Sequence, residues 1–276
     1  MQLATIRAAD GTRAVRREGD DLVLLKAPSV KELLEADSLE AAAHDEAGGS
    51  VALAAADFAP LIPRPEKILC VGLNYRSHIL ETGNQLPDYP TFFAKFSRAL
   101  IGAQDDIVLP HVATGPDWEV ELGVVVGRAV RHAGLEEARA AIAGYTIVND
   151  ITMRDWQRRT LQWLQGKTFE QTTPVGPFLV TGDEVGDALD LEVRCEVEGE
   201  VMQQDRTSEL VFGPAECVAY ASDIITLEPG DLISTGTTGG VGWARTPPVF
   251  LKAGQQVRTV VEGLGECVNT CVDEER

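Results

Sequence analysis

Short runs of apolar or alternating residues recur along the whole chain and are typical of β-strands. We expect strands at residues 2–7, 12–16, 22–25, 67–72, 118–126, 145–149, 178–180, 191–197, 231–234 and 256–261. Fewer segments have the spacing of an amphipathic helix, and these lie at 29–35, 135–142, 154–164 and 214–224. Because strands dominate without alternating regularly with helices, the pattern predicts a strand-rich α+β fold and disfavours a doubly wound sheet or an eightfold barrel.

A cluster of prolines marks a connector between two parts of the chain. Pro60, Pro63 and Pro65 follow the short leading strands and helix, and they precede the apolar strand expected at 67–72. We therefore predict a small N-terminal α/β module at residues 1–62 and a larger domain at 66–276. The module carries no residues that suggest chemistry, and the sequence does not decide what it does.

The composition narrows the classes of partner. The chain has 276 residues, 44% of them hydrophobic, which is enough for a full core. Its formal net charge of −19 argues against nucleic acid or an anionic membrane as a partner. The N-terminus lacks a signal-peptide pattern, and no window approaches the apolar length of a membrane span. Five scattered cysteines fit reduced thiols, so we expect a cytoplasmic protein.

Two carboxylates stand one residue apart in a strand that is otherwise apolar, WEVELGVVVG at residues 118–127. Side chains alternate along a strand, so Glu119 and Glu121 point to the same face. Like charges that close repel each other, and a hard divalent cation bound by oxygen atoms would neutralise them. A solvent-facing strand edge is the alternative.

A third acid, Asp150, follows another apolar stretch and could complete the site from the end of a neighbouring strand. Three oxygen ligands leave positions for water or a chelating substrate on Mg²⁺ or Mn²⁺, with Ca²⁺ as a third candidate. Asp117 shares the face of the two glutamates, but it follows Gly115 and Pro116 in the sequence. We interpret it as a solvated turn acid and leave it out of the ligand set.

A second constellation is formed by His78 and Glu81, which are three residues apart and would share one face of a short helix. A carboxylate at that spacing can orient an imidazole, or the pair can share a proton with a bound water. The same spacing also arises on exposed helices that have no catalytic role.

Basic residues follow Asp150 at helical spacing. Arg154 and Lys167 are cations near the expected metal site, suited to a substrate carboxylate or a developing oxyanion, and Gln157 accompanies them. We interpret Arg158 and Arg159 as part of a solvated helix face.

The glycine-rich stretch at 234–242 follows a strand, but neither a Gly-Lys-Ser/Thr ending nor a glycine-led helix comes after it. Nucleotide-binding motifs are therefore excluded. What remains is either a loop whose backbone N–H groups approach an anion or a plain turn.

Taken together and in this order, these segments resemble the fumarylacetoacetate hydrolase family, and among its members the bacterial type that is acylpyruvate hydrolase-like. The resemblance covers the chain from about residue 66 to the C-terminus. The matching pieces are 72–75 with His78 and Glu81, 118–122, Gly144 and Tyr145 with Asn149 and Asp150, Arg154 with Gln157, Gly166 with Lys167, 174–178, Gly236 with Thr237, and 262–265 with Asn269.

The resemblance implies a mixed β-sandwich roll that forms a homodimer, and it implies a role for each matching residue. It identifies Glu119, Glu121 and Asp150 as metal ligands. The implied catalytic residues are His78, Glu81 and Lys167, and the implied substrate-binding residues are Tyr75, Arg154, Gln157, Gly236 and Thr237. The chain departs from the family pattern at two places. Val71 stands where longer members carry a fourth metal-binding aspartate, and Thr238 replaces the proline of the usual Gly-Thr-Pro turn.

The leading hypothesis is metal-dependent hydrolysis of a carbon–carbon bond in a 2,4-dioxo acid, either an acylpyruvate or fumarylpyruvate or a 2,4-dioxo-3-deoxy sugar acid. The product would be pyruvate or a related 2-oxo acid. One alternative is decarboxylation or isomerisation of oxaloacetate or a hydroxymuconic-type diacid at the same site. The other is a protein that binds oxo acids with a metal and does no chemistry.

Overall fold

The computed structural model describes residues 1–9, 11–45, 47–81, 83 and 85–275. In this part of the chain, one sheet has eleven strands in the order β4-β3-β2-β1-β13-β11-β10-β16-β5-β6, with β7 paired to β13. These strands are β1 (Gln2–Ala8), β2 (Gly11–Glu18), β3 (Asp21–Leu24), β4 (Ser50–Ala52), β5 (Ile68–Gly72), β6 (Thr91–Ala94), β7 (Leu100–Ile101), β10 (Val120–Val126), β11 (Ile142–Asn149), β13 (Thr173–Val180) and β16 (Leu232–Thr237).

A second sheet has five strands in the order β15-β14-β17-β18-β8, and a short ribbon pairs β12 with β9. These strands are β8 (Ile107–Leu109), β14 (Glu192–Val197), β15 (Glu200–Arg206), β17 (Gln256–Val261) and β18 (Gly265–Asp273), with β9 (Pro116–Asp117) and β12 (Thr152–Met153) in the ribbon. The α-helices are α1 (Val30–Glu35), α2 (Arg76–Glu81), α3 (Leu135–Ala140), α4 (Arg154–Gln157), α5 (Leu164–Lys167), α6 (Gly182–Val185) and α7 (Pro214–Ile224). Short 3₁₀ turns lie at Ala41–Ala43, Leu53–Ala55, Ser97–Ala99, Thr207–Glu209 and Gly242–Ala244.

The strand-rich α+β prediction is confirmed, and most expected strands are present with shifted ends. The expected helix at 154–164 is wrong, because the chain forms two separate short helices, α4 and α5. The Thr160 hydroxyl donates to the backbone oxygen of Gln162 and accepts from its backbone N–H, which competes with helical hydrogen bonding at this point. The pattern missed β15, an edge strand whose side chains are mostly polar.

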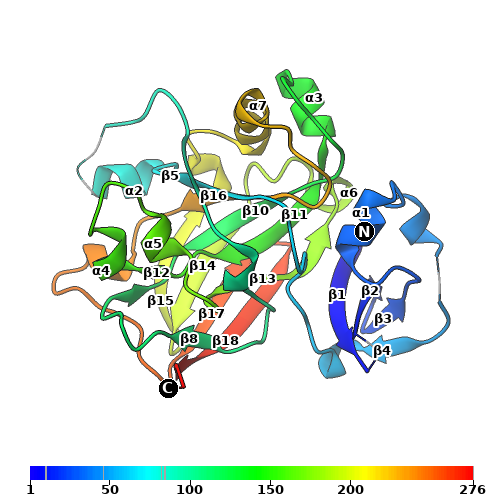
Figure 1. Ribbon diagram of the computed structural model, residues 1–276, viewed down its shortest axis with the longest axis horizontal. Helices are drawn as coiled ribbons and strands as arrows, with labels where there is room; N and C mark the ends of the chain where they lie inside the picture. Colours follow the sequence, from blue (N-terminus) through cyan, green and yellow to red (C-terminus); the bar gives the residue numbers. More distant parts are fainter. Residues whose placement is uncertain (10, 46, 82, 84, 276) are drawn as a thin grey trace.

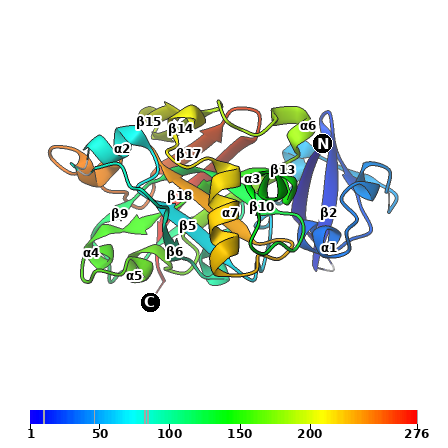
Figure 2. The same ribbon diagram turned by 90° about the horizontal axis from the view of Figure 1, so that it is seen from above.

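The leading strands continue the larger sheet. Gln2 pairs with Val180 and Leu3 with Leu179, so β1 lies beside β13 in antiparallel register. Figure 1 shows these leading strands on the opposite side of the molecule from α2 and α4, and Figure 2 shows the same separation from above. The division into two domains stays a prediction, and the N-terminal strands are far from the candidate active site described below.

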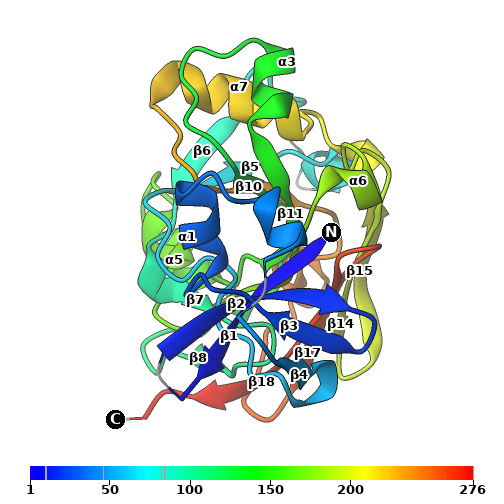
Figure 3. The same cartoon turned by 90° about the vertical axis from the view of Figure 1, so that its right-hand side faces the viewer.

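Two hydrophobic cores cover the two faces of the larger sheet. On β10, Val120, Leu122 and Val124 belong to the core that also contains residues of the second sheet, whereas Val125 belongs to the other core. The alternation of side chains therefore places Glu119 and Glu121 on the face that points away from the second sheet. Figure 3 shows α3 and α7 packed together along one edge. The longest helix, α7, has 11 residues, and no helix of the described residues has the length and apolarity that a membrane span requires.

Candidate active site

Three buried acids meet where β10 and β11 pair. Val120 lies opposite Asn149, and the backbone N–H of Asp150 donates to the backbone oxygen of Glu119 at 2.9 Å. One carboxylate oxygen from each of Glu119, Glu121 and Asp150 lies within 4.8 Å of the others. Their exposed fractions are 4%, 1% and 0%, so the alternative of a solvent-facing strand edge is wrong.

Two buried ammonium groups contact this acid triad. Lys167 Nζ lies 2.6 Å from Glu119 Oε2 and 2.7 Å from Asp150 Oδ2, and Lys95 Nζ lies 2.6 Å from Asp150 Oδ1. Lys95 follows β6 and was not identified from the sequence, where a lysine between Phe93 and Phe96 was the only signal. Asp150 is therefore held by one lysine at each of its two oxygens.

The two glutamates lie in different electrostatic surroundings. Burial raises the pKa of Glu121 to about 8, and the charges of Asp150 and Glu119 add to the effect. Burial also acts to raise the pKa of Glu119, but Lys167 and Arg154 outweigh it and lower that pKa to about 2. Glu121 accepts hydrogen bonds from Ser234 Oγ at 2.5 Å and from the Gly236 N–H at 2.8 Å. Neither donor carries a positive charge, so Glu121 is the acid of the triad whose ionised form most needs a cation.

The residues present fit a hard divalent cation. Around the triad, four buried carboxylates face three buried cations, and these are Asp117, Glu119, Glu121 and Asp150 with Lys95, Arg154 and Lys167. With all four carboxyls ionised, the described residues of this cluster carry an excess of negative charge, and the triad supplies the oxygen donors that Mg²⁺ and Mn²⁺ prefer. Val71 lines the same cavity with a side chain that has no donor atom.

Asp117 connects the active-site arginine to a surface loop. Its carboxylate accepts from Arg154 Nε at 2.7 Å and from the backbone N–H groups of Gly242 at 2.7 Å and Trp243 at 3.0 Å. The interpretation of Asp117 as a solvated turn acid is wrong, because the loop at Gly242 and Trp243 covers it and leaves it fully buried. It nevertheless lies outside the metal-type cluster found among the described residues.

The guanidinium of Arg154 contacts three polar side chains. Besides Asp117 it contacts Glu119 Oε1 at 2.7 Å and donates to Gln157 Oε1 at 3.1 Å. Burial acts to lower its pKa, but Asp117 and Glu119 outweigh this and raise the pKa well above its usual value. The guanidinium is therefore a fixed positive charge that orients Glu119.

We expect Asp117→Asn to lower the free energy of unfolding by about 3 kcal/mol, because the variant leaves the buried Arg154 with one carboxylate fewer. Urea denaturation measures this change. The control is Asp223→Asn, which removes an exposed acid paired with His132 and should cost less than about 0.5 kcal/mol. Equal effects of the two substitutions would contradict the role of Asp117.

His78 and Glu81 lie on α2, as their spacing predicts. His78 Nδ1 is 3.6 Å from Glu81 Oε2, and the Gly240 N–H lies 3.2 Å from the same carboxylate oxygen. His78 in turn lowers the pKa of Glu81, with the Gly240 N–H adding to the effect against a smaller burial penalty. Glu81 is thus suited to orient an imidazole, and it ties α2 to the glycine-rich loop.

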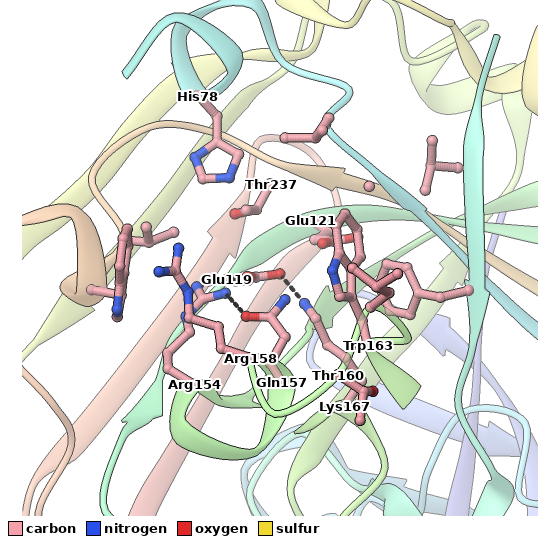
Figure 4. Close-up of a pocket in the computed structure, with 17 residues that line it drawn as sticks. His78, Glu119, Glu121, Arg154, Gln157, Arg158, Thr160, Trp163, Lys167 and Thr237 are labelled. Carbon is pink, nitrogen blue, oxygen red and sulfur yellow. Dashed lines mark hydrogen bonds and ion pairs between the residues drawn. The ribbon is translucent and has the colours of Figure 1, made fainter. Parts of the chain in front are cut away.

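A cavity of about 590 Å³ contains most of these groups. Figure 4 shows His78 on the wall opposite Lys167, with Glu119, Glu121 and Thr237 between them. The predicted site residues that line it are His78, Glu119, Glu121, Arg154, Gln157, Lys167 and Thr237. Lining residues that were not proposed as site residues from the sequence include Arg158, Trp163 and Trp243.

Four predicted site residues lie behind the cavity wall and do not line it. Asp150 and Glu81 contact lining residues, as described above. The Gly236 N–H is used by Glu121, and Tyr75 is fully buried. Burial raises the pKa of the Tyr75 hydroxyl, which has no hydrogen-bond partner among the described residues. The substrate-binding roles expected of five residues all stay predictions, and these residues are Tyr75, Arg154, Gln157, Gly236 and Thr237.

Steric packing explains why a glycine precedes Lys167. A Cβ atom on Gly166 would lie 2.4 Å from the backbone nitrogen of Gln157, so only glycine lets α5 approach α4 this closely. That approach brings Lys167 into the acid cluster.

The chain belongs to the fumarylacetoacetate hydrolase family. Residues 67–272 match the family model described as "Fumarylacetoacetate (FAA) hydrolase C-terminal". The fold agrees with this assignment, since the solved structure of a fumarylacetoacetate hydrolase from Exiguobacterium antarcticum superposes over 99% of this chain with a TM-score of 0.88 and 27% identity.

Three similar proteins carry different activities in their names. Oxaloacetate tautomerase Fahd2a, mitochondrial, of Rattus norvegicus is 43% identical over 212 residues, which are 76% of this chain and 68% of the relative. The structure of 5-carboxymethyl-2-hydroxymuconate delta-isomerase from Mycobacterium smegmatis has 34% identity and a TM-score of 0.82, with 100% of both chains covered. Maleylpyruvate hydrolase from Sphingobium sp. SYK-6, solved with manganese(II) and pyruvate, has 28% identity and a TM-score of 0.81 at the same coverage.

Proposed function

We propose that this protein is a divalent-metal-dependent enzyme that acts on 2-oxo acids through their enol form. The observation that carries the proposal is the buried triad of Glu119, Glu121 and Asp150 in a cavity whose opposite wall holds His78. Support comes from the similar proteins, whose names include a tautomerase, an isomerase and a hydrolase of oxo acids.

The triad would hold Mg²⁺ or Mn²⁺. When bound there, such a cation polarises a 2-oxo acid that chelates it and stabilises negative charge on the 2-oxygen. Lys167 orients two of the three ligands and adds a fixed positive charge to the same region. Burial alone would lower the pKa of Lys167, but Asp150 and Glu119 raise it, so the side chain stays charged and acts electrostatically rather than as a base.

His78 would transfer the proton. In the keto form, a proton leaves C3, the C2–C3 double bond forms, and the 2-oxygen takes up a proton to give the enol. An imidazole on the wall facing the acids is placed to accept the proton from C3 and to return it in the reverse direction. Glu81 would keep the ring oriented and stabilise its protonated form.

Keto–enol tautomerisation of oxaloacetate is the first candidate reaction. It is favoured by the relative named as an oxaloacetate tautomerase, because identity of 43% extends over 76% of this chain. The reaction needs only the proton transfer assigned to His78.

Hydrolysis of a carbon–carbon bond in an acylpyruvate is the second candidate. The His78 and Glu81 pair favours it, since the same imidazole can take a proton from water as the oxygen attacks the 4-carbonyl. Cleavage of the C3–C4 bond then releases pyruvate as its enol. The similarity to maleylpyruvate hydrolase supports this candidate.

Removal of divalent cations is expected to reduce turnover to background, and added Mg²⁺ or Mn²⁺ should restore it. The measurement uses metal-stripped protein with oxaloacetate, acetylpyruvate and fumarylpyruvate, and it identifies products by NMR. Loss of the enol signal without new carbon fragments indicates tautomerisation. Release of pyruvate from acetylpyruvate or fumarylpyruvate, together with acetate or fumarate, indicates hydrolysis, whereas release of pyruvate and CO₂ from oxaloacetate indicates decarboxylation. Full turnover in the presence of a chelator would contradict the metal requirement.

The cytoplasmic location and the homodimer stay predictions of the sequence. All five cysteines are free and buried, which agrees with the expectation of reduced thiols.

A further inference from the structure

One cation on the cavity wall has no acidic partner. Arg154 is paired with Asp117 and Glu119, and Lys167 with Glu119 and Asp150. Arg158 lines the same cavity, yet its side chain forms no ion pair or hydrogen bond with any described residue. Arg158 is solvent-exposed at the end of α4, as the sequence interpretation expected, but it also lines the cavity.

Arg158 is held in place by an aromatic ring. Its guanidinium carbon lies 3.3 Å from the centroid of a Trp243 ring, a contact of the cation–π type. The main chain that carries the ring is anchored, because the backbone N–H of Trp243 donates to the buried Asp117 at 3.0 Å. Stacking uses the face of the guanidinium and leaves the N–H groups at its edge available for a carboxylate.

The surroundings of Arg158 favour an anion. Partial burial and the charge of Arg154 both lower the pKa of Arg158, so the guanidinium is held beside a like charge. Figure 4 shows its side chain on the same side of the cavity as Arg154 and Gln157, next to the acid cluster. An anion that extends from the triad along this wall would come within reach of Arg158.

A 2-oxo dicarboxylic acid has the matching arrangement of charges. Its first carboxylate and 2-oxygen form the chelating group, and its second carboxylate lies further along the molecule. We propose that Arg158, stacked on Trp243, binds this second carboxylate, so that the preferred substrates are 2-oxo dicarboxylates rather than 2-oxo monocarboxylates. This inference rests on the proposed function and names the substrate class of that site.

The test compares oxaloacetate with its 4-methyl ester, which differs by the loss of the distal charge. We expect Arg158→Gln to lower kcat/KM for oxaloacetate about tenfold, equivalent to about 1.4 kcal/mol, through KM and with kcat retained. For the ester, the same substitution should change kcat/KM less than twofold. The matched control is the next residue, Arg159→Gln, whose side chain stacks on Trp156 and lies near Asp155. It carries the same charge change and should leave both substrates unaffected.

A second variant and a binding measurement separate this inference from the proposed function. Trp243→Leu keeps the charge of Arg158 but removes the ring on which its guanidinium stacks. This variant should lose part of the preference for oxaloacetate, a dianion, over the ester. Dissociation constants for oxaloacetate and the ester, measured with Mg²⁺ by calorimetry, report the preference even if neither compound is turned over. A binding preference that depends on Arg158 without turnover would support the inference and overturn the proposed function.

Two results would contradict the inference. If the wild-type protein binds the dianion no more tightly than the ester, the inference is overturned whatever the activity. If turnover is observed but Arg158→Gln affects oxaloacetate and the ester equally, the inference fails while the proposed function stands.

Discussion

Asp150→Asn is expected to abolish turnover and to lower the melting temperature by roughly 10 °C. The substitution removes one carboxylate of the proposed metal site, for which we expect a loss in kcat/KM of about a thousandfold or more. It also removes the one carboxylate within ion-pair distance of Lys95 in the described part of the chain. A buried charge left without its partner costs about 3–5 kcal/mol, which accounts for the lower melting temperature.

A double variant distinguishes the structural and catalytic contributions of Asp150. Lys95→Met in the Asp150→Asn background removes the uncompensated charge and should recover much of the lost stability, because an apolar side chain of similar length tolerates burial. Turnover should stay at background. Thermal unfolding and steady-state kinetics measure the two effects, and Asp155→Asn in the neighbouring helix α4 is the control. Recovery of turnover together with stability would show that Asp150 has only a structural role.

His78→Ala is expected to lower kcat by about 10²–10⁴-fold, the usual contribution of a positioned acid or base. Metal affinity, measured by calorimetry, should be retained because the imidazole is not part of the triad that the metal would use. Glu81→Gln should have a smaller effect, about tenfold, because in the proposed mechanism Glu81 only orients the ring, from which it lies 3.6 Å.

The control for His78 is His132→Ala, which removes an exposed imidazole paired with Asp223 on another part of the surface. It should leave both kcat and metal affinity unchanged. If His78→Ala retained the wild-type kcat for every substrate tested, proton transfer by this residue would be excluded.

Local patterns along the chain were sufficient for several elements. The strand at 256–261 and the helix at 214–224 have the predicted bounds, since each has a regular apolar pattern and clear ends. The pattern was insufficient where a single local contact ended a helix, as at Thr160, and where a strand lies at a sheet edge with polar side chains, as in β15. Such elements depend on hydrogen bonds that periodicity does not record.

The orientation of Glu119 and Glu121 was determined by the sequence alone, because alternation along a strand is a local property of the backbone. Their proximity to Asp150 was a reasonable expectation from the sequence, although the register of β10 against β11 was needed to establish it. The buried ion pair of Lys95 with Asp150 could not be derived, since the two residues are brought together from different strands.

Asp117, Arg158 and Arg159 show what only the tertiary structure decided. Asp117 is buried because a loop more than a hundred residues further along the chain folds over it. Arg158 and Arg159 are adjacent and of the same type, yet one lines the cavity on Trp243 and the other stacks on Trp156. The sequence by itself determined which residue types could hold a metal and move a proton. The long-range packing of loops and helices decided which charges are buried, which are paired, and which one is left for a ligand.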